Sequence, residues 1–211
     1  MHREVEAGRR MRVIAGSLRS RVLAAPDGMD TRPTADRLRE TLFNVLTQGA
    51  VDRVAGTHVL DLYAGSGAVG IEALSRGAAS ITFVEQAPVA LAVLRKNLES
   101  LGVKAGFAIE KRKVGPFLRL TSEKGIAAKF GLAFLDPPYE AADEYATTLG
   151  LLGGDCAGLL ADGAWVVAEH RRKAVLEERY GALVRFRIKQ QGDAALSFYE
   201  GNARGEDLTQ S

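Results

Sequence analysis

A glycine-rich segment that follows a short apolar stretch is the first candidate for chemistry in this sequence. Gly65, Gly67 and Gly70 match the pattern G-x-G-x-x-G. Glycine adopts positive φ angles and lets a ligand lie directly against the backbone. Glu85 ends the next apolar stretch, eighteen residues after Gly67, where a carboxylate can accept both hydroxyl groups of a ribose. This order predicts a site for a cofactor that contains a nucleoside. The alternative is a tight turn followed by a surface glutamate.

An acidic residue just before the glycines bears on the choice of cofactor. Asp61 ends the preceding apolar stretch, where its negative charge would repel the pyrophosphate of a dinucleotide. A carboxylate there suits a cofactor that carries an amine, such as the methionine part of S-adenosylmethionine, directly or through water. The electrostatic argument favours this methyl donor, and an NAD-dependent enzyme is the alternative.

The tetrapeptide Asp136-Pro137-Pro138-Tyr139 is the second candidate, directly after the apolar segment 131–135. Two prolines fix the backbone and remove two N–H donors, so this loop presents mostly acceptors. The Asp136 carboxylate and the Pro137 carbonyl could each accept one N–H of an exocyclic amine, while a base stacks on Tyr139. Two such acceptors favour a pyramidal nitrogen whose lone pair points at the methyl group, and a sulfonium donor needs no metal. A rigid turn with an incidental tyrosine is the alternative.

Strands and helices are predicted to alternate around these residues. Strands are expected in short apolar segments at 57–61, 80–85, 105–109, 131–135 and 163–170. Helices are expected at 69–76, 88–101, 116–122, 141–152, 155–160 and 172–179. This alternation requires parallel strands with right-handed crossovers, so the predicted class is α/β, doubly wound. Two final strands, 183–188 and 195–200, predict a C-terminal antiparallel hairpin. Ligands of such sheets bind at the carboxyl ends of the strands.

The first 48 residues are predicted to form a small extension with its own charge. They hold nine arginines, no lysine and six acidic residues, a net charge of +3. Arginine forks suit phosphates and base edges, although a solvated surface is the alternative. Segments 12–15 and 20–23 suggest a short hairpin, and Thr34 can cap a helix over 35–47.

Several classes of protein are excluded by composition. Cys156 is the single cysteine, so no internal disulfide can form, and no group of cysteines and histidines has zinc-binding spacing. No apolar run is long enough to span a membrane, and residues 1–10 lack the apolar core of a signal peptide. We therefore expect a cytoplasmic protein with no membrane or metal partner, whose translation starts at Met1 or Met11. Residues 202–211 are expected to be a disordered tail.

The sequence resembles the bacterial 16S ribosomal RNA guanine-N2-methyltransferases that act on guanine 966, the RsmD family. The resemblance runs from about Arg12 to Tyr199. It rests on residues 12–16, 31–44, 61–70, 72–76, 85 and 136–139. The first two of these blocks separate the family from DNA amine methyltransferases, which share only the general D-P-P-Y motif.

The resemblance implies a Rossmann-like S-adenosylmethionine-dependent methyltransferase domain over residues 49–201, with the extension over 1–48 on the substrate side. It implies a donor site made by Asp61, Tyr63, Gly65, Ser66, Gly67 and Glu85. It implies that the guanine amine is held by Asp136, Pro137 and Tyr139. It implies contacts with RNA from Arg32, Thr34, Arg37 and Arg39. Packing is the competing role for Arg39, which lies at the edge of the apolar stripe.

The implied activity is methyl transfer from S-adenosylmethionine to the N2 amine of guanine 966 in 16S rRNA. The expected partner is 16S rRNA within a partly assembled small subunit, because the shape of a folded ribonucleoprotein can supply specificity that a small, modestly basic enzyme lacks. Naked RNA is the alternative, and we expect a monomer. A DNA adenine or cytosine methyltransferase is one alternative, although 211 residues leave little room for a separate target-recognition segment. An RNA-binding module that has lost catalysis is another.

One position departs from the family pattern. Related sequences usually carry Asp or Asn after the third strand, near the adenine amine of the donor. By its spacing to Phe117 and Leu118, Lys113 occupies that place. Since lysine cannot accept a hydrogen bond, either Glu110 or the backbone serves the adenine, or donor affinity is weakened.

Overall fold

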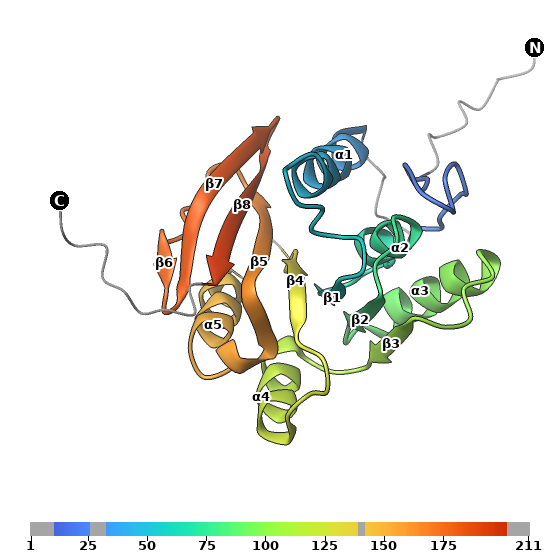
Figure 1. The fold of residues 1–211 in the computed structure, drawn as a ribbon. Helices are drawn as coiled ribbons and strands as arrows, with labels where there is room; N and C mark the ends of the chain where they lie inside the picture. Colours follow the sequence, from blue (N-terminus) through green and yellow to red (C-terminus); the bar gives the residue numbers. More distant parts are fainter. Residues whose placement is uncertain (1–10, 26–32, 139–141, 202–211) are drawn as a thin grey trace, which may run out of the picture.

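A single eight-stranded sheet forms the centre of the protein, in the strand order β3-β2-β1-β4-β5-β8-β7-β6 (Figure 1). The computed structural model describes residues 11–25, 33–138 and 142–201. The strands are β1 His58–Leu62, β2 Ser80–Val84, β3 Phe107–Glu110, β4 Phe130–Leu135, β5 Leu160–Arg171, β6 Arg179–Tyr180, β7 Leu183–Gln191 and β8 Ala194–Gly201. The helices are α1 Pro33–Thr47, α2 Ala68–Ser75, α3 Pro88–Ser100, α4 Val114–Lys124 and α5 Ala142–Gly153, with a 3-10 turn at Ala157–Leu159.

The direction of the strands confirms the predicted doubly wound α/β class with a C-terminal hairpin. Strands β1 to β5 are parallel to one another, whereas the pairs β5–β8, β8–β7 and β7–β6 are antiparallel. The chain runs outward from β1 through β2 to β3 and then returns to β4 on the other side of β1. The gap between the carboxyl ends of β1 and β4 is therefore the topological switch point, where open sheets of this class bind ligands.

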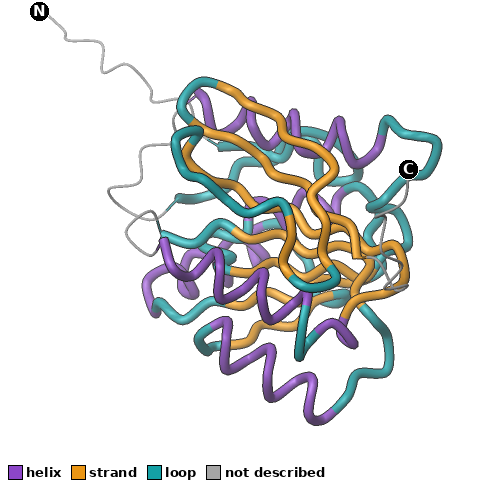
Figure 2. Tube along the Cα trace, turned by 90° about the vertical axis from the view of Figure 1, so that its left-hand side faces the viewer, coloured by secondary structure: helices purple, strands orange, loops and turns teal. Residues whose placement is uncertain are grey.

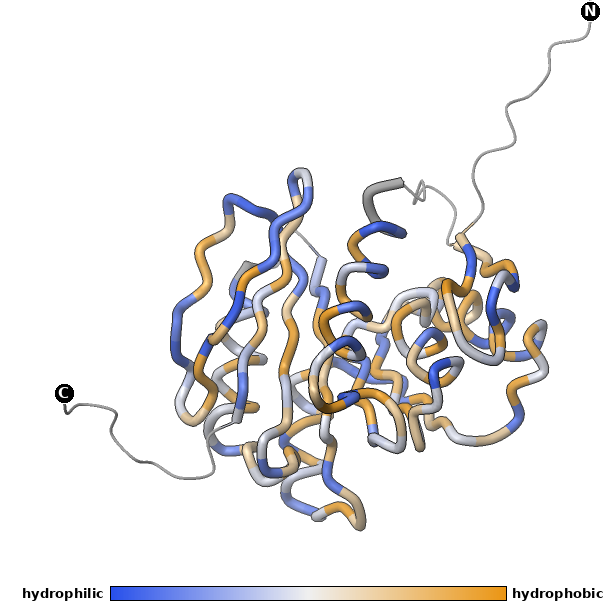
Figure 3. Tube along the Cα trace, turned by 45° about the horizontal axis from the view of Figure 1, so that its top comes forward, coloured by the Kyte–Doolittle hydropathy of each residue, from blue (hydrophilic) through white to orange (hydrophobic). Residues whose placement is uncertain are grey.

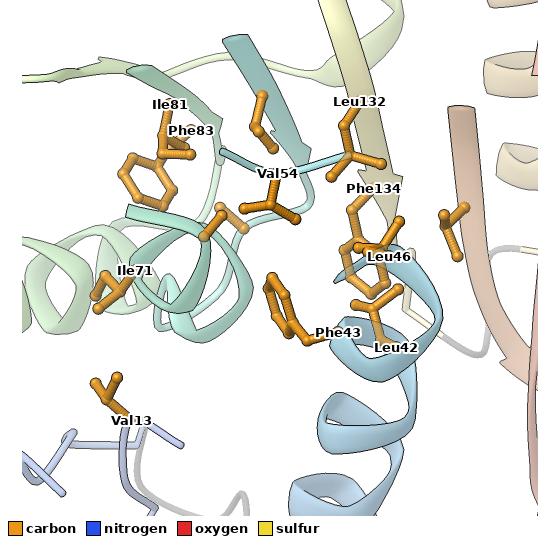
Figure 4. Close-up of a cluster of buried hydrophobic side chains, with 14 of the residues drawn as sticks. Val13, Leu42, Phe43, Leu46, Val54, Ile71, Ile81, Phe83, Leu132 and Phe134 are labelled. Carbon is orange, nitrogen blue, oxygen red and sulfur yellow. The ribbon is translucent and has the colours of Figure 1, made fainter. Parts of the chain in front are cut away.

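Helices cover both faces of the sheet (Figure 2). One buried cluster joins α1, α2 and α3 to residues such as Val59 and Phe134, and the opposite cluster joins α4 and α5 to Leu60 and Leu135. The alternation along each strand produces these two cores, because successive side chains point to opposite faces. In the first cluster, Phe43 of α1 lies between the β-strands and α2 (Figure 4).

The N-terminal extension is fastened to α2 by polar contacts. The Glu72 carboxylate, which is fully buried, accepts the backbone N–H groups of Ile14 and Ala15 at 2.7 and 3.0 Å. Ser75 Oγ accepts the N–H of Leu18 at 2.9 Å. A Cβ on Gly16 would lie 1.8 Å from the Ser75 carbonyl oxygen, so only glycine fits this close approach. These contacts explain why residues 72–76 and 12–16 carry the family resemblance together.

Some predicted elements differ from the structure. The hairpin expected at 12–15 and 20–23 is reduced to one isolated bridge between Arg12 and Val22. The helix expected at 172–179 is absent from the described structure, where a turn leads into β6. Leu176 of this segment is buried but Val175 is 90% exposed, so one apolar residue alone provides too little buried face to stabilise a helix. The helix expected at 155–160 is only the 3-10 turn, after which β5 begins. Among the described helices, none has the length and apolar character needed to cross a membrane.

Candidate active site

The loop between β1 and α2 needs its glycines for two different reasons. Gly65 and Gly67 have φ angles of 56° and 78°, in the left-handed region that favours glycine. A Cβ on Gly67 would lie 2.2 Å from Cδ1 of Leu94, so the loop packs directly on α3. A Cβ on Gly65 would meet nothing closer than the Tyr63 carbonyl oxygen at 3.9 Å. Gly65 therefore faces open space, where a ligand can approach the backbone.

The carboxylate of Glu85 joins the end of β2 to this loop. It accepts the N–H of Gly65 at 2.9 Å and the N–H of Ala87 at 2.7 Å. Each carboxylate oxygen keeps a second lone pair, so both can still accept a hydroxyl group. The structure thus brings two predicted donor-site residues, Gly65 and Glu85, into direct contact.

Ser66 is held through a residue that the sequence interpretation missed. Asn97 of α3 is 1% exposed, and its Nδ2 donates to the Ser66 carbonyl oxygen at 2.9 Å. The same amide donates to the Ala24 carbonyl at 3.0 Å and accepts the Ala24 N–H at 2.8 Å. Asn97 therefore couples the glycine loop to the N-terminal extension. A polar residue beside Leu94 and Leu98 on the apolar stripe of α3 was the available signal.

Asp61 is almost completely buried at the end of β1, with 2% of its surface exposed. Its Oδ2 accepts the N–H of Gly70 at 2.9 Å. Burial raises the pKa of Asp61 to about 8; the negative charges of Asp136 and Glu85 also raise it, and the Gly70 hydrogen bond opposes the rise. Acidic groups at this edge of the sheet create a negative potential, which suits a cationic ligand.

Tyr63 points its hydroxyl at α5. The hydroxyl donates to Glu144 at 2.6 Å and lies 2.8 Å from the hydroxyl of Thr148. Its backbone has a φ of 60°, which is unusual for a residue with a side chain. Because the hydroxyl is occupied, only the backbone and the ring face of Tyr63 are left for the predicted donor contact.

Asp136 follows β4 directly, beside β1 in the sheet. Burial raises the pKa of its carboxyl to about 7. Pro137 is buried and Pro138 is exposed, so the loop turns outward after Asp136. The structure therefore places Asp61, Glu85 and Asp136 at one edge of the sheet, at the ends of β1, β2 and β4. Tyr139 lies outside the described residues.

Glu169 is a fourth acidic residue at this edge, and the sequence interpretation missed it. Leu135 of β4 pairs with Ala168 of β5, so the next residues of the two segments, Asp136 and Glu169, are neighbours. Burial raises the pKa of Glu169 to about 8; the Asp136 charge adds to the rise and the Arg39 charge opposes it. Its position resembles that of Asp61 and Asp136, since each is an acidic residue that follows a run of apolar ones.

Arg39 corrects one prediction. Its side chain is only 6% exposed, and Nη2 donates to the Arg12 carbonyl oxygen at 2.7 Å and to Asp36 at 3.0 Å. Burial lowers the pKa of its guanidinium, which the neighbouring charges of Asp36, Glu72 and Glu169 counteract. A side chain enclosed in this way does not reach RNA phosphates, so the competing packing role fits the structure.

Arg39→Ala should lower the free energy of unfolding by about 2 kcal/mol, because it removes charge-assisted hydrogen bonds from a buried site. Chemical denaturation would measure this change. Arg37→Ala is the matched control, since Arg37 is exposed on the same helix and should leave stability unchanged. Equal stability of the two variants would contradict the packing role.

Basic residues near the turn end of the β7–β8 hairpin were also missed. Arg172, Lys173, Arg187 and Lys189 are exposed, and this end of the hairpin is visibly hydrophilic (Figure 3). The Thr41 hydroxyl of α1 donates to Gln191 at 2.8 Å, so the hairpin end lies beside α1. Among the residues predicted to contact RNA, Arg37 is exposed on α1, Arg32 lies outside the described residues, and Thr34 is described only as part of the α1 backbone.

The end of the third strand, β3, shows which residues lie near Lys113, the position where related sequences usually carry Asp or Asn. Lys113 is exposed and precedes α4, while Glu110 ends β3 and forms an ion pair with Arg112 at 3.0 Å. Glu110, three residues before Lys113, is therefore a carboxylate that could accept a hydrogen bond in place of the missing Asp or Asn, although Arg112 competes for it.

Comparisons with known proteins cover nearly the whole chain. A family model described as conserved hypothetical protein 95 matches residues 11–200. Ribosomal RNA small subunit methyltransferase D of Escherichia coli strain K12 is 38% identical over 197 residues, which cover 93% of this chain and 92% of that protein. A protein called putative rRNA methyltransferase YlbH, from Bacillus subtilis strain 168, is 34% identical over 190 residues, 90% of this chain and 98% of that protein.

Solved structures agree with this relationship. The structure of a putative methyltransferase, yhhF, from Escherichia coli superposes with a TM-score of 0.76 at 32% identity, over 93% of this chain and all of that one. The chain therefore belongs to the conserved hypothetical protein 95 family, which is the RsmD family of small-subunit ribosomal RNA methyltransferases.

Proposed function

We propose that this protein transfers a methyl group from S-adenosylmethionine to the N2 amine of a guanine in 16S rRNA, the base at position 966. The proposal also holds that the substrate is the rRNA of a partly assembled small subunit. The observation that carries it is the meeting of a glycine loop and the acidic residues Asp61, Glu85 and Asp136 at the topological switch point. Family membership supports the same chemistry.

The described residues fit the methyl donor. Glu85 keeps free lone pairs for the ribose hydroxyls, and Gly65 leaves open space in front of its backbone. The negative charge of Glu85, joined by those of Asp61 and Asp136 once the pH exceeds their raised pKa values, favours the amine and the sulfonium cation of the donor. When bound, S-adenosylmethionine supplies an electrophilic methyl group on its sulfonium sulfur. The protein positions that group and excludes water from it.

Asp136 has two roles in the proposed reaction. Its ionised carboxylate accepts one N–H of the guanine amine, and the Pro137 carbonyl accepts the other. The nitrogen lone pair forms the new N–C bond while the S–C bond breaks and its electron pair stays on sulfur. The methylated nitrogen then carries one proton too many, and a carboxylate with a pKa near 7 can accept it.

RNA binding is proposed for the face that carries Arg37 and the basic end of the hairpin. Arg37→Ala and Arg172→Ala should each weaken RNA binding and reduce its salt dependence by about one unit of slope per lost phosphate contact. Donor affinity should stay the same. Affinity for an rRNA fragment across a salt series measures this effect, with exposed Lys124→Ala of α4 as the matched control. An unchanged slope in both variants would place the RNA elsewhere.

The proposed function can be tested with radiolabelled methyl donor and three substrates: naked 16S rRNA, small subunits that lack the modification, and duplex DNA. The expected result is label at the N2 position of guanine 966, with the subunit preferred over naked RNA. Mapping the labelled nucleotide by mass spectrometry distinguishes this guanine from others. Label in DNA, on another base, or on none of the three substrates would overturn the proposal.

A further inference from the structure

We propose that Glu169 recognises the target base by accepting the N1–H of guanine beside Asp136, and that it thereby selects guanine against bases that carry an acceptor at this place. The inference rests on the proposed function, since it concerns the base whose 2-amine Asp136 holds. It assigns the choice of base to a residue on β5.

Sheet register puts the two carboxylates side by side. Leu135 pairs with Ala168, and both belong to the core beneath α4 and α5. Phe134 and Val167, one residue earlier, belong to the core beneath α1. By this alternation, Asp136 and Glu169 point to the α1 side of the sheet, from segments about 4.8 Å apart. Both carboxylates therefore face the same space at the switch point.

The described residues provide no hydrogen-bond donor for either carboxylate. Among the described residues, no hydrogen bond or ion pair reaches the side-chain oxygens of Asp136 or Glu169. The backbone at Glu169 is nevertheless fixed, because its carbonyl accepts the Tyr145 hydroxyl at 2.9 Å and the residue pairs with Leu196 of β8. Burying a carboxylate without a hydrogen-bond donor costs free energy. The two half-buried carboxylates therefore indicate a ligand that supplies the missing donors.

Arg39 provides a second observation. Its guanidinium is buried on the α1 side, and its charge acts on Glu169. Its Nε has no hydrogen-bond partner among the described residues. The Arg39 charge opposes the rise in the pKa of Glu169, so it favours the ionised carboxylate. At a pH above about 8 the ionised form predominates and can only accept hydrogen bonds. Arg39 is thus a positioning residue for this acceptor.

The edge of guanine matches two adjacent acceptors. Guanine presents N1–H and the 2-amine as neighbouring donors on its Watson–Crick edge. Adenine N1 and cytosine N3 present a lone pair instead, which an ionised Glu169 would repel. A site built to accept a hydrogen bond rejects strongly an analogue that lacks the donor, because the buried acceptor is left unpaired.

An RNA that carries 2-aminopurine at the target position tests the inference, since this base keeps the 2-amine but has a lone pair on N1. At a pH above 8, where Glu169 is ionised, the wild-type protein should prefer guanine to 2-aminopurine by tenfold or more in a competition between the two RNAs. Glu169→Gln can donate to N1, so it should reduce this preference at least tenfold, with donor affinity and melting temperature unchanged. Exposed Glu123→Gln of α4 is the matched control and should keep the wild-type preference.

The preference is a ratio measured in one sample, so it does not depend on the fraction of active protein. A wild-type protein that methylates both RNAs equally would overturn the inference without any variant, and so would E169Q with the wild-type preference. E169Q that is inactive on both RNAs yet folded would also overturn it, since only discrimination is assigned to Glu169. If the wild-type protein fails to methylate guanine at all, the proposed function itself fails.

Discussion

Asp136→Ala is expected to slow methyl transfer a hundredfold or more while donor affinity stays nearly unchanged. In the proposed function the carboxylate faces the target amine, and it receives no hydrogen bond from a described residue, so its loss removes an oriented acceptor and little packing. Removal of one such oriented group typically costs on the order of 3 kcal/mol of transition-state stabilisation. Single-turnover methylation of the rRNA substrate, beside calorimetric titration with S-adenosylmethionine, separates the rate from donor binding.

The control for this variant is Asp162→Ala, which removes an exposed carboxylate near the other end of β5. It should be active at the wild-type rate. An Asp136→Ala enzyme with nearly wild-type turnover would remove Asp136 from the catalytic site.

The pH dependence of kcat/KM for the wild-type enzyme should follow the ionisation of Asp136. Burial raises the pKa of Asp136 to about 7, so the ionised acceptor is lost as the pH falls below that value. We therefore expect kcat/KM to rise between about pH 6 and pH 8, since this parameter reports the free enzyme. A flat profile over this range would contradict a requirement for ionised Asp136.

Glu85→Ala is expected to weaken binding of S-adenosylmethionine by about 1.5–3 kcal/mol, roughly 10- to 150-fold, the usual value for hydrogen bonds to a charged group. The structure adds a second cause, because the same carboxylate holds the N–H of Gly65 and so fastens the glycine loop to β2. The rate at saturating donor should change much less. Calorimetry with the donor, and with NADH as a competing ligand, measures both expectations.

Glu99→Ala of α3 is the matched control, since Glu99 is an exposed glutamate outside the loop. It should bind the donor as the wild type does. Unchanged donor affinity in Glu85→Ala, together with NADH binding by the wild-type protein, would favour the dinucleotide alternative.

Local sequence patterns were sufficient to predict the order of most strands and helices. Apolar runs of five or six residues predict β1, β2 and β4, and Pro88 and Gly102 bracket α3, because each signal lies within a few residues of the element it marks. The segment at 172–179 was predicted wrongly as a helix for the same reason. Its residues permit a helix, but only Leu176 is buried while Val175 is exposed, so the segment lacks the apolar stripe that would stabilise one.

Some positions in the site likewise follow from local sequence, and others depend on tertiary packing. The sequence by itself determined that Asp61, Glu85 and Asp136 end strands, and parallel strands bring such ends to one edge. Only the tertiary structure decided that Arg39 is enclosed, because its burial depends on Arg12 and on the sheet beneath α1. Proximity of Glu169 to Asp136 likewise depends on the register between β4 and β5, which is set by packing across distant segments and leaves no local mark in the sequence.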